Sequence, residues 1–117
     1  MNRGINGNTG ATTDIWIDAF SHCDNTHLSL CIEVKGSWNQ ETLTALDNQL
    51  IGKYMGEGGA DAGILLVGWF QSKNKPIRNV FNNDKGNAEI ELTAQEKSAN
   101  EKGYLVKCVI LDCPAQY

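Results

Sequence analysis

The chain of 117 residues is predicted to form an α/β domain, a mixed β-sheet flanked by helices. Two short segments, residues 14–18 and 28–35, alternate between apolar and other side chains, which is typical of strands with two different faces. Residues 62–70 are a continuous apolar run, which is typical of a strand buried on both faces in a parallel sheet. A helix is predicted between them, so the order strand, helix, buried strand indicates a right-handed βαβ unit.

The first two segments are predicted to pair as a hairpin, because the turn-rich residues 21–26 separate them. On the first strand, Asp14, Trp16 and Asp18 share a face. On the second strand, side chains of two kinds point to opposite sides. The apolar side consists of Leu28, Leu30, Ile32 and Val34, and the other side consists of Ser29, Cys31, Glu33 and Lys35.

The helix is predicted to begin after Gly36 and to run to about Met55. Ser37-Trp38-Asn39-Gln40 has the form of a capping box, with Ser37 as the N-cap. Spacings of three and four residues give the helix one apolar stripe. The stripe consists of Leu43, Leu46, Leu50 and Tyr54, and the glycine-rich residues 56–59 end the helix.

Residues 71–86 are polar and read as irregular, residues 92–102 are predicted to be helical, and residues 104–112 form a last strand. The strands at 28–35 and 64–70 are expected to be parallel neighbours. Residues 1–117 read as a single domain with a flexible arm at residues 1–12. The chain could also be a module of a longer protein. It could then form a homodimer or be joined to an additional domain.

Composition excludes some classes of function. The net charge of −4 argues against a protein that coats nucleic acid non-specifically. No apolar run approaches the ~20 residues that cross a bilayer, and no signal peptide is visible, so a cytoplasmic protein without a membrane partner is expected.

The four cysteines form no CxxC pair. A zinc site from His22, Cys23, His27 and Cys31 matches no common spacing, and free thiols are the favoured reading.

One acid and one amine stand side by side on the second strand, and they are the best candidates for chemistry. Glu33 and Lys35 share a face, and Asp14 lies on the preceding strand. Carboxylates of this kind bind divalent cations, and a neighbouring lysine can steer a water. Asp18 is the alternative to Asp14 as a ligand. The plainer interpretation is that Glu33 and Lys35 form a solvated ion pair, which stabilises a protein very little.

This order of residues resembles the PD-(D/E)XK nuclease superfamily, over about residues 14–70. The resemblance implies a restriction-endonuclease-like fold and a Mg²⁺-dependent phosphodiesterase that cleaves nucleic acid, DNA more than RNA. Asp14 and Glu33, with the Val34 carbonyl, would hold Mg²⁺ or Mn²⁺, and Lys35 would act on the attacking water. Gln49 would lean over the site as a catalytic residue, and Tyr54 would contact the nucleic-acid backbone.

The spacing of the last two residues departs from the family. Many members place the aromatic residue four positions after the glutamine, and here the two are five apart. On an α-helix this turns Tyr54 about 140° from Gln49 instead of about 40°. Tyr54 also belongs to the apolar stripe and could be a core residue.

Substrate contact is predicted in the polar segment after the apolar strand, which carries Lys73, Lys75, Arg78 and Lys85. Loops after parallel strands border the crevice where ligands bind. A solvated loop would have the same composition. The alternative function is a non-catalytic module, binding nucleic acid or protein, that retains the nuclease fold. Trp16, Trp38 and Trp69 are expected to be core residues rather than platforms for bases.

Overall fold

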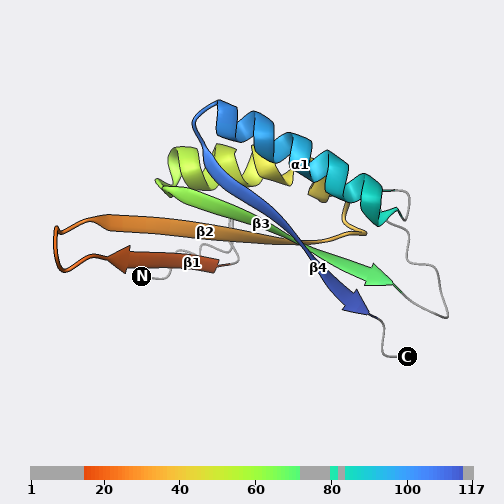
Figure 1. The fold of residues 1–117 in the computed structure, drawn as a ribbon, viewed down its shortest axis with the longest axis horizontal. Helices are drawn as coiled ribbons and strands as arrows, with labels where there is room; N and C mark the ends of the chain where they lie inside the picture. The colour runs from red at the N-terminus through yellow and green to blue at the C-terminus, as the bar shows by residue number, and fades with distance from the viewer. Residues whose placement is uncertain (1–14, 72–79, 82–83, 115–117) are drawn as a thin grey trace.

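The computed structural model of the chain describes residues 15–71, 80–81 and 84–114, and within them it shows an α/β fold (Figure 1). Four strands form one mixed sheet, and two long helices and one short 3₁₀ helix connect them. In chain order the elements are β1 (Ile15–Phe20), β2 (His27–Gly36), the 3₁₀ helix η2 (Gln40–Leu43), the π-helix η3 (Leu46–Glu57), β3 (Ala62–Gln71), α1 (Lys85–Glu101) and β4 (Leu105–Pro114).

The strands lie in the sheet in their chain order, β1-β2-β3-β4. β1 and β2 form the predicted antiparallel hairpin, in which Ile15 pairs with Ile32 and Asp18 pairs with Ser29. β2 and β3 are parallel neighbours, as predicted, with Glu33 beside Leu65. β4 adds to β3 in parallel at the other edge of the sheet.

Both long helices cover the same face of the sheet (Figure 1). The strand order explains this arrangement, because the chain moves across the sheet in one direction from β2 to β3 to β4. Two crossovers of the same hand that move in the same direction place both helices on one face. The prediction of a sheet flanked by helices is therefore met on one side only, and none of the described helices covers the other side.

We call these two sides the covered face and the open face. Alternation along the strands assigns each residue to a face from the register. The covered face includes Trp16 and Asp18 of β1, Ser29, Cys31, Glu33 and Lys35 of β2, Leu65, Val67 and Trp69 of β3, and Val106, Cys108 and Ile110 of β4. The open face includes Ile15, Ile17, Leu30, Ile32, Val34, Ile64, Leu66, Phe70, Val109, Leu111 and Cys113.

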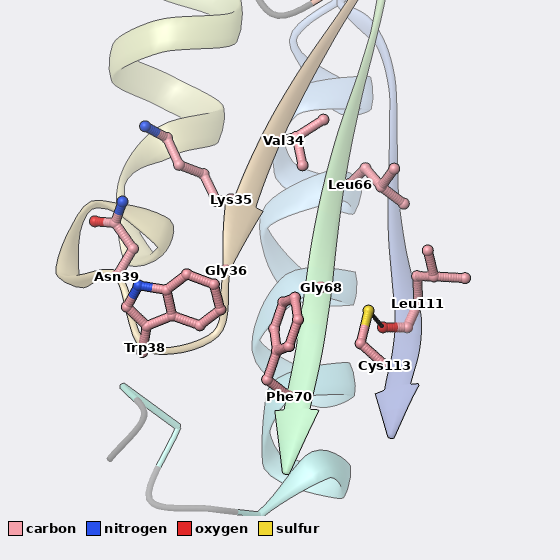
Figure 2. Close-up of a pocket in the computed structure, with 10 residues that line it drawn as sticks. All are labelled: Val34, Lys35, Gly36, Trp38, Asn39, Leu66, Gly68, Phe70, Leu111 and Cys113. Carbon is pink, nitrogen blue, oxygen red and sulfur yellow. Dashed lines mark hydrogen bonds between the residues drawn. The ribbon is translucent and has the colours of Figure 1, made fainter. Parts of the chain in front are cut away.

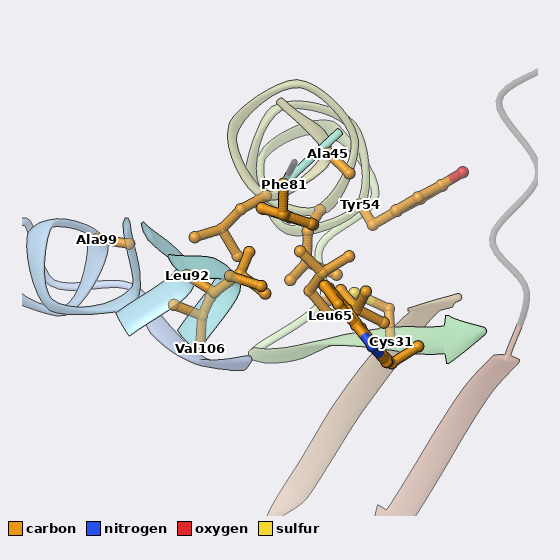
Figure 3. Packing of buried hydrophobic residues seen from close by; sticks show 14 residues of the cluster. Cys31, Ala45, Tyr54, Leu65, Phe81, Leu92, Ala99 and Val106 are labelled. Atoms are coloured by element: carbon orange, nitrogen blue, oxygen red, sulfur yellow. The ribbon is translucent and has the colours of Figure 1, made fainter. Parts of the chain in front are cut away.

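The hydrophobic core lies between the covered face and the helices (Figure 3). Leu46 and Leu50 of η3 and Leu65 of β3 are completely buried. Leu92 of α1 and Val106 of β4 extend this cluster under the second helix. Removing this much apolar surface from water is the main source of stability for a domain of this size.

The start of the first helical segment differs from its prediction. Ser37 is not an N-cap: it is fully buried, its N–H donates to the Gly68 carbonyl at 2.9 Å, and its hydroxyl accepts from the Phe70 N–H at 3.3 Å. These bonds fasten the end of β2 to β3. The cap is instead Asn39, whose side chain accepts from the Glu41 N–H at 2.9 Å to begin η2.

The predicted continuous helix at 38–55 is two helices, and the longer one, η3, is a π-helix. Its hydrogen bonds join residues five apart, as at its end, where the Gly58 N–H donates to the Lys53 carbonyl at 2.8 Å. Glycine suits this winding, because a Cβ on Gly52 would lie 2.9 Å from the Asp47 carbonyl oxygen. Leu46, Leu50 and Tyr54 of the predicted stripe are buried, whereas Leu43 lies in η2 and is exposed.

Helix α1 begins at Lys85, seven residues earlier than its predicted start at residue 92. Asp84 caps it, since its carboxylate accepts from the Asn87 N–H at 3.1 Å. The first turn contains Gly86 and Asn87, which disfavour helix on propensity alone. A capping carboxylate therefore compensates for two weak helix formers.

Candidate functional site

The centre of the candidate site is a buried ion pair at the end of β2. Glu33 has a side-chain exposure of 4% and Lys35 one of 12%, and the Lys35 Nζ lies 3.4 Å from Glu33 Oε2. Both side chains extend from the covered face, as the alternation of β2 requires. The predicted convergence of Glu33 with the Lys35 amine is therefore present.

A second carboxylate, that of Glu41, joins the pair. Its Oε1 lies 3.3 Å from the Lys35 Nζ, and its side chain is exposed at 63%. Glu41 belongs to η2, which the Asn39 cap places directly after β2. Glu41 could not be singled out from the sequence, because its approach to Lys35 depends on the 3₁₀ turn rather than on a continuous helix.

Val34 and Asp14 are the other predicted metal ligands. Val34 lies between Glu33 and Lys35, and its side chain points to the open face, so its main-chain carbonyl is the only group that it offers as a ligand. Asp14 lies outside the described residues. The last described pair of the β1–β2 register is Ile15 with Ile32, one position before Glu33 on β2 and one residue after Asp14 in the sequence.

The π-helix changes the relation between Gln49 and Tyr54. The hydrogen bonds of η3 join residues five apart. Gln49 and Tyr54 therefore lie on the same side of the helix, one turn apart. The departure in spacing noted in the sequence is thus offset by the winding of the helix. Gln49 is partly exposed, and Tyr54 is buried at 6% exposure in the core cluster (Figure 3).

The predicted substrate-binding residues Lys73, Lys75 and Arg78 lie outside the described residues. Lys85, from the same basic segment, is described. It begins α1 and forms an ion pair with Asp112 of β4 at 2.7 Å. Its ammonium group therefore fastens a helix start to the sheet.

Asp18, the alternative ligand, belongs to a separate polar cluster. Its carboxylate accepts from the Ser29 hydroxyl at 2.7 Å, contacts His27 Nε2 at 2.9 Å and accepts from the Trp16 indole at 3.1 Å. The hydrogen bond from Ser29 and those from His27 and Trp16 lower the pKa of Asp18 to about 2. Its strand partner Ser29 lies four residues before Glu33, roughly 13 Å along β2, so Asp18 does not join the Glu33 site.

Among the described residues, no three His, Cys, Asp or Glu side chains form a cluster suited to a metal ion. Cys31, from the zinc alternative, is fully buried, whereas His22 and Cys23 lie exposed in the hairpin turn. Within the same described ranges, no helix is long and apolar enough to span a bilayer.

A cavity of about 380 Å³ lies on the open face, at the carboxyl ends of the three parallel strands (Figure 2). Trp38 and Phe70 form one wall, with their ring centroids 4.7 Å apart in an edge-to-face arrangement. Trp69 is a core residue as expected, and Trp16 is partly buried against the core, but Trp38 is exposed at 49%. The expectation that all three tryptophans belong to the core is wrong for Trp38, because it lies two residues beyond Gly36, the last residue of β2, and over the open face.

We compared the chain with protein-family models, with curated proteins and with solved structures, and none of them matches it.

Proposed function

We propose that the chain is a metal-dependent nuclease that hydrolyses phosphodiester bonds in nucleic acid, DNA more than RNA. The observation that carries the proposal is the Glu33–Lys35 pair, which is almost completely buried at the end of a parallel strand. Charged groups are costly to bury, and an ion pair is seldom a gain in stability over apolar residues of the same size. A buried pair in this position is therefore better explained by chemistry than by stability.

The charge balance around Lys35 supports a divalent cation. Two carboxylates, Glu33 and Glu41, share one ammonium group, so the cluster has a net charge of −1. On the sequence argument, Asp14 adds a second carboxylate ligand to Glu33. Carboxylate and main-chain carbonyl oxygens are the ligands that Mg²⁺ and Mn²⁺ prefer. We assign Glu33, Asp14 and the Val34 carbonyl to the ion.

The bound ion supplies charge stabilisation for the scissile phosphate and a water of lowered pKa. The residues of the chain do the positioning. Lys35, held between Glu33 and Glu41, donates hydrogen bonds to the attacking water or to a phosphate oxygen. Gln49 is partly exposed on η3, from which it orients the water, whereas Tyr54 is buried at 6% exposure and packs in the core, so it is not assigned to the substrate.

The test is cleavage of labelled single-stranded and double-stranded DNA and RNA, with Mg²⁺, with Mn²⁺ and with EDTA. Wild-type protein should cleave only with a divalent cation. Glu33→Gln, Asp14→Asn and Lys35→Met should each reduce cleavage roughly a thousandfold or more, because the parts of one catalytic unit fail together.

Asp18→Asn is the matched control, since it removes a carboxylate from the same hairpin outside the proposed site, and it should cleave at nearly the wild-type rate. Cleavage that continues in EDTA, or in Glu33→Gln, would contradict the proposal.

A second candidate is a non-catalytic interaction module. The open face favours it, since Ile15, Ile17, Val34, Val109 and Leu111 are exposed there at 39–53%. Apolar patches of this extent mark interaction sites in soluble proteins. Protein that binds labelled DNA without cleaving it under any of these conditions would favour this candidate over the nuclease.

A further inference from the structure

Most of the residues that line the cavity on the open face have no part in the proposed cleavage site, and only Val34 and Lys35 belong to both. Its floor comes from the open-face residues Val34 and Leu66, and its far side from Leu111 and Cys113 of β4. The aromatic wall of Trp38 and Phe70 completes it. Ligands of α/β proteins bind at the carboxyl ends of parallel strands, and this cavity lies at the ends of all three. Its volume of about 380 Å³ is within the range of small-molecule sites.

Two glycines let the aromatic rings lie against the sheet. A Cβ on Gly36 would lie 2.3 Å from the indole of Trp38, and a Cβ on Gly68 would lie 2.7 Å from the ring of Phe70. Any larger residue at either position would push its ring away from the backbone. The two glycines thus set the depth of the cavity and the position of its aromatic wall.

We infer that this cavity binds a nucleobase of the substrate, from a nucleotide next to the cleaved bond. The inference rests on the proposed nuclease function and names the substrate class: nucleic acid whose base is unpaired, either in a single strand or turned out of a duplex. The half-exposed ring of Trp38 suits base stacking, which does not depend on sequence. A base inside a duplex presents no free ring face to such a wall.

Charge supports a base rather than a phosphate group as the occupant. Among the described residues that line the cavity, only Lys35 is charged, and its ammonium lies on the other side of β2 from Val34, between Glu33 and Glu41 (Figure 2). The cavity therefore offers apolar and aromatic surface to its occupant. At the rim, Asn39 carries an amide that suits the hydrogen-bonding edge of a base.

Lys35 also connects the cavity with the proposed cleavage site. The residue lines the cavity on one side of β2 and places its amine beside Glu33 on the other side. A strand that passes over the end of β2 would present a phosphate to the covered side and the adjoining base to the open side. One nucleotide would thus occupy both sites.

The experiment measures binding by the inactive variant Glu33→Gln of the full chain, using fluorescence anisotropy. The probes are a labelled 12-nucleotide DNA strand, the same strand with abasic positions throughout its centre, and the corresponding duplex. The single strand should bind at least tenfold more tightly than the abasic strand, since stacking of one base on an aromatic residue accounts for a factor of this size.

Two substitutions, each added to Glu33→Gln, test the cavity from opposite sides. Trp38→Leu removes the aromatic wall, and Leu111→Trp fills the cavity from β4, where the native side chain is 53% exposed and a larger one is tolerated. Both should abolish the preference for the strand with bases. Phe20→Leu is the matched control, because Phe20 is exposed at 69% in β1, away from the cavity, and it should keep the preference. Trp38→Tyr should keep it too.

Equal binding of ordinary and abasic strands, or a preference that survives both cavity substitutions, would overturn the inference. Absence of binding to every probe would also overturn it. A wild-type dimer in sedimentation that Leu111→Asp converts to a monomer would assign the open face to a second copy of the chain. The cleavage assay is independent: wild-type protein that binds bases through Trp38 but cleaves nothing would refute the proposed nuclease and leave the base site in place.

Discussion

The covered face and the open face of the sheet are formed by the same strands, yet β2 places its more polar side chains on the covered face and its apolar side chains on the open face. Its side chains under the helices are Ser29, Cys31, Glu33 and Lys35, whereas those on the open face are Leu28, Leu30, Ile32 and Val34. An isolated amphipathic strand would be expected to turn its apolar side to the core. The neighbouring strand β3 resolves this conflict, because Leu65 and Val67 supply the apolar surface under the helices.

The comparison shows that alternation alone does not reveal which side of a strand is covered. The directions of the crossovers decide it, and here they bring both helices to the polar side of β2. The cost is a buried ion pair on one face and exposed apolar side chains on the other. Such costs are typical of functional sites, and each face here carries one proposed site.

The largest expected difference between the faces is in the effect of removing a leucine. Leu65→Ala should lower the free energy of unfolding by about 3 kcal/mol, since Leu65 is completely buried in the core. Leu111→Ala should change it by less than about 0.5 kcal/mol, because that side chain is half exposed. Urea unfolding followed by circular dichroism measures both, and equal losses would mean that the open face is covered in solution.

The buried pair should respond unequally to loss of its two members. Lys35→Met leaves the Glu33 carboxylate in a nearly inaccessible position without its ammonium at 3.4 Å, and we expect a loss of about 2 kcal/mol or more. Glu33→Gln should cost less, about 1 kcal/mol or below, because Lys35 keeps the exposed carboxylate of Glu41. The same urea unfolding compares the two variants. The opposite order would show that Glu41 does not stabilise Lys35 when Glu33 is replaced.

Thiol chemistry separates the faces more finely. Burial raises the pKa of Cys31 to about 11 and that of Cys108 to about 12, and both residues lie on the covered face. At pH 8 they should react with iodoacetamide only after unfolding, because the thiolate is the nucleophile. Cys23 in the exposed hairpin and Cys113 on the open face should react in the native protein. Mass spectrometry of the labelled peptides distinguishes two modified cysteines from four.

The smallest expected effect is a pH dependence at the far end of the hairpin. The pKa of Asp18 is lowered from 3.8 to about 2 by hydrogen bonds from Ser29, His27 and Trp16. A lowered folded-state pKa contributes stability above pH 4 that is lost as the pH falls toward 2. Asp18→Asn should therefore flatten the decline in stability between these values. Urea midpoints from pH 6 to pH 2 measure it, and an unchanged slope would show that the cluster contributes nothing.

The sequence predicted the four strands, the hairpin and the parallel neighbours, because these follow from alternation and from one continuous apolar run. It also predicted the proximity of Glu33 and Lys35, since residues two apart on a strand must share a face. The cap at Ser37 was predicted wrongly because its competitor is tertiary. The bonds of Ser37 with Gly68 and Phe70 join residues more than thirty positions apart, and nothing local distinguishes Ser37 from Asn39 as a cap.

The remaining differences arise from weak local signals. Helix α1 begins seven residues before its predicted start, because the Asp84 cap compensates for the low helix propensity of Gly86 and Asn87 in the first turn. The approach of Glu41 to Lys35 depends on a 3₁₀ turn that propensity does not predict. The exposure of Trp38 depends on which face the helices cover. Asp14 and the basic residues Lys73, Lys75 and Arg78 lie outside the described residues, so their roles remain predictions from the sequence.

In η3, a change of one residue in chain length can be offset by a change of helix type. Residues five apart on η3 occupy the positions that residues four apart occupy on an α-helix. Deleting Gly52 would shorten the interval from Gln49 to Tyr54 by one residue and remove the position where a Cβ would lie 2.9 Å from the Asp47 carbonyl oxygen. The shortened segment could then wind as an ordinary α-helix and still present both side chains on one side. We therefore expect a deletion of one residue here to keep Gln49 and Tyr54 on one side of the helix.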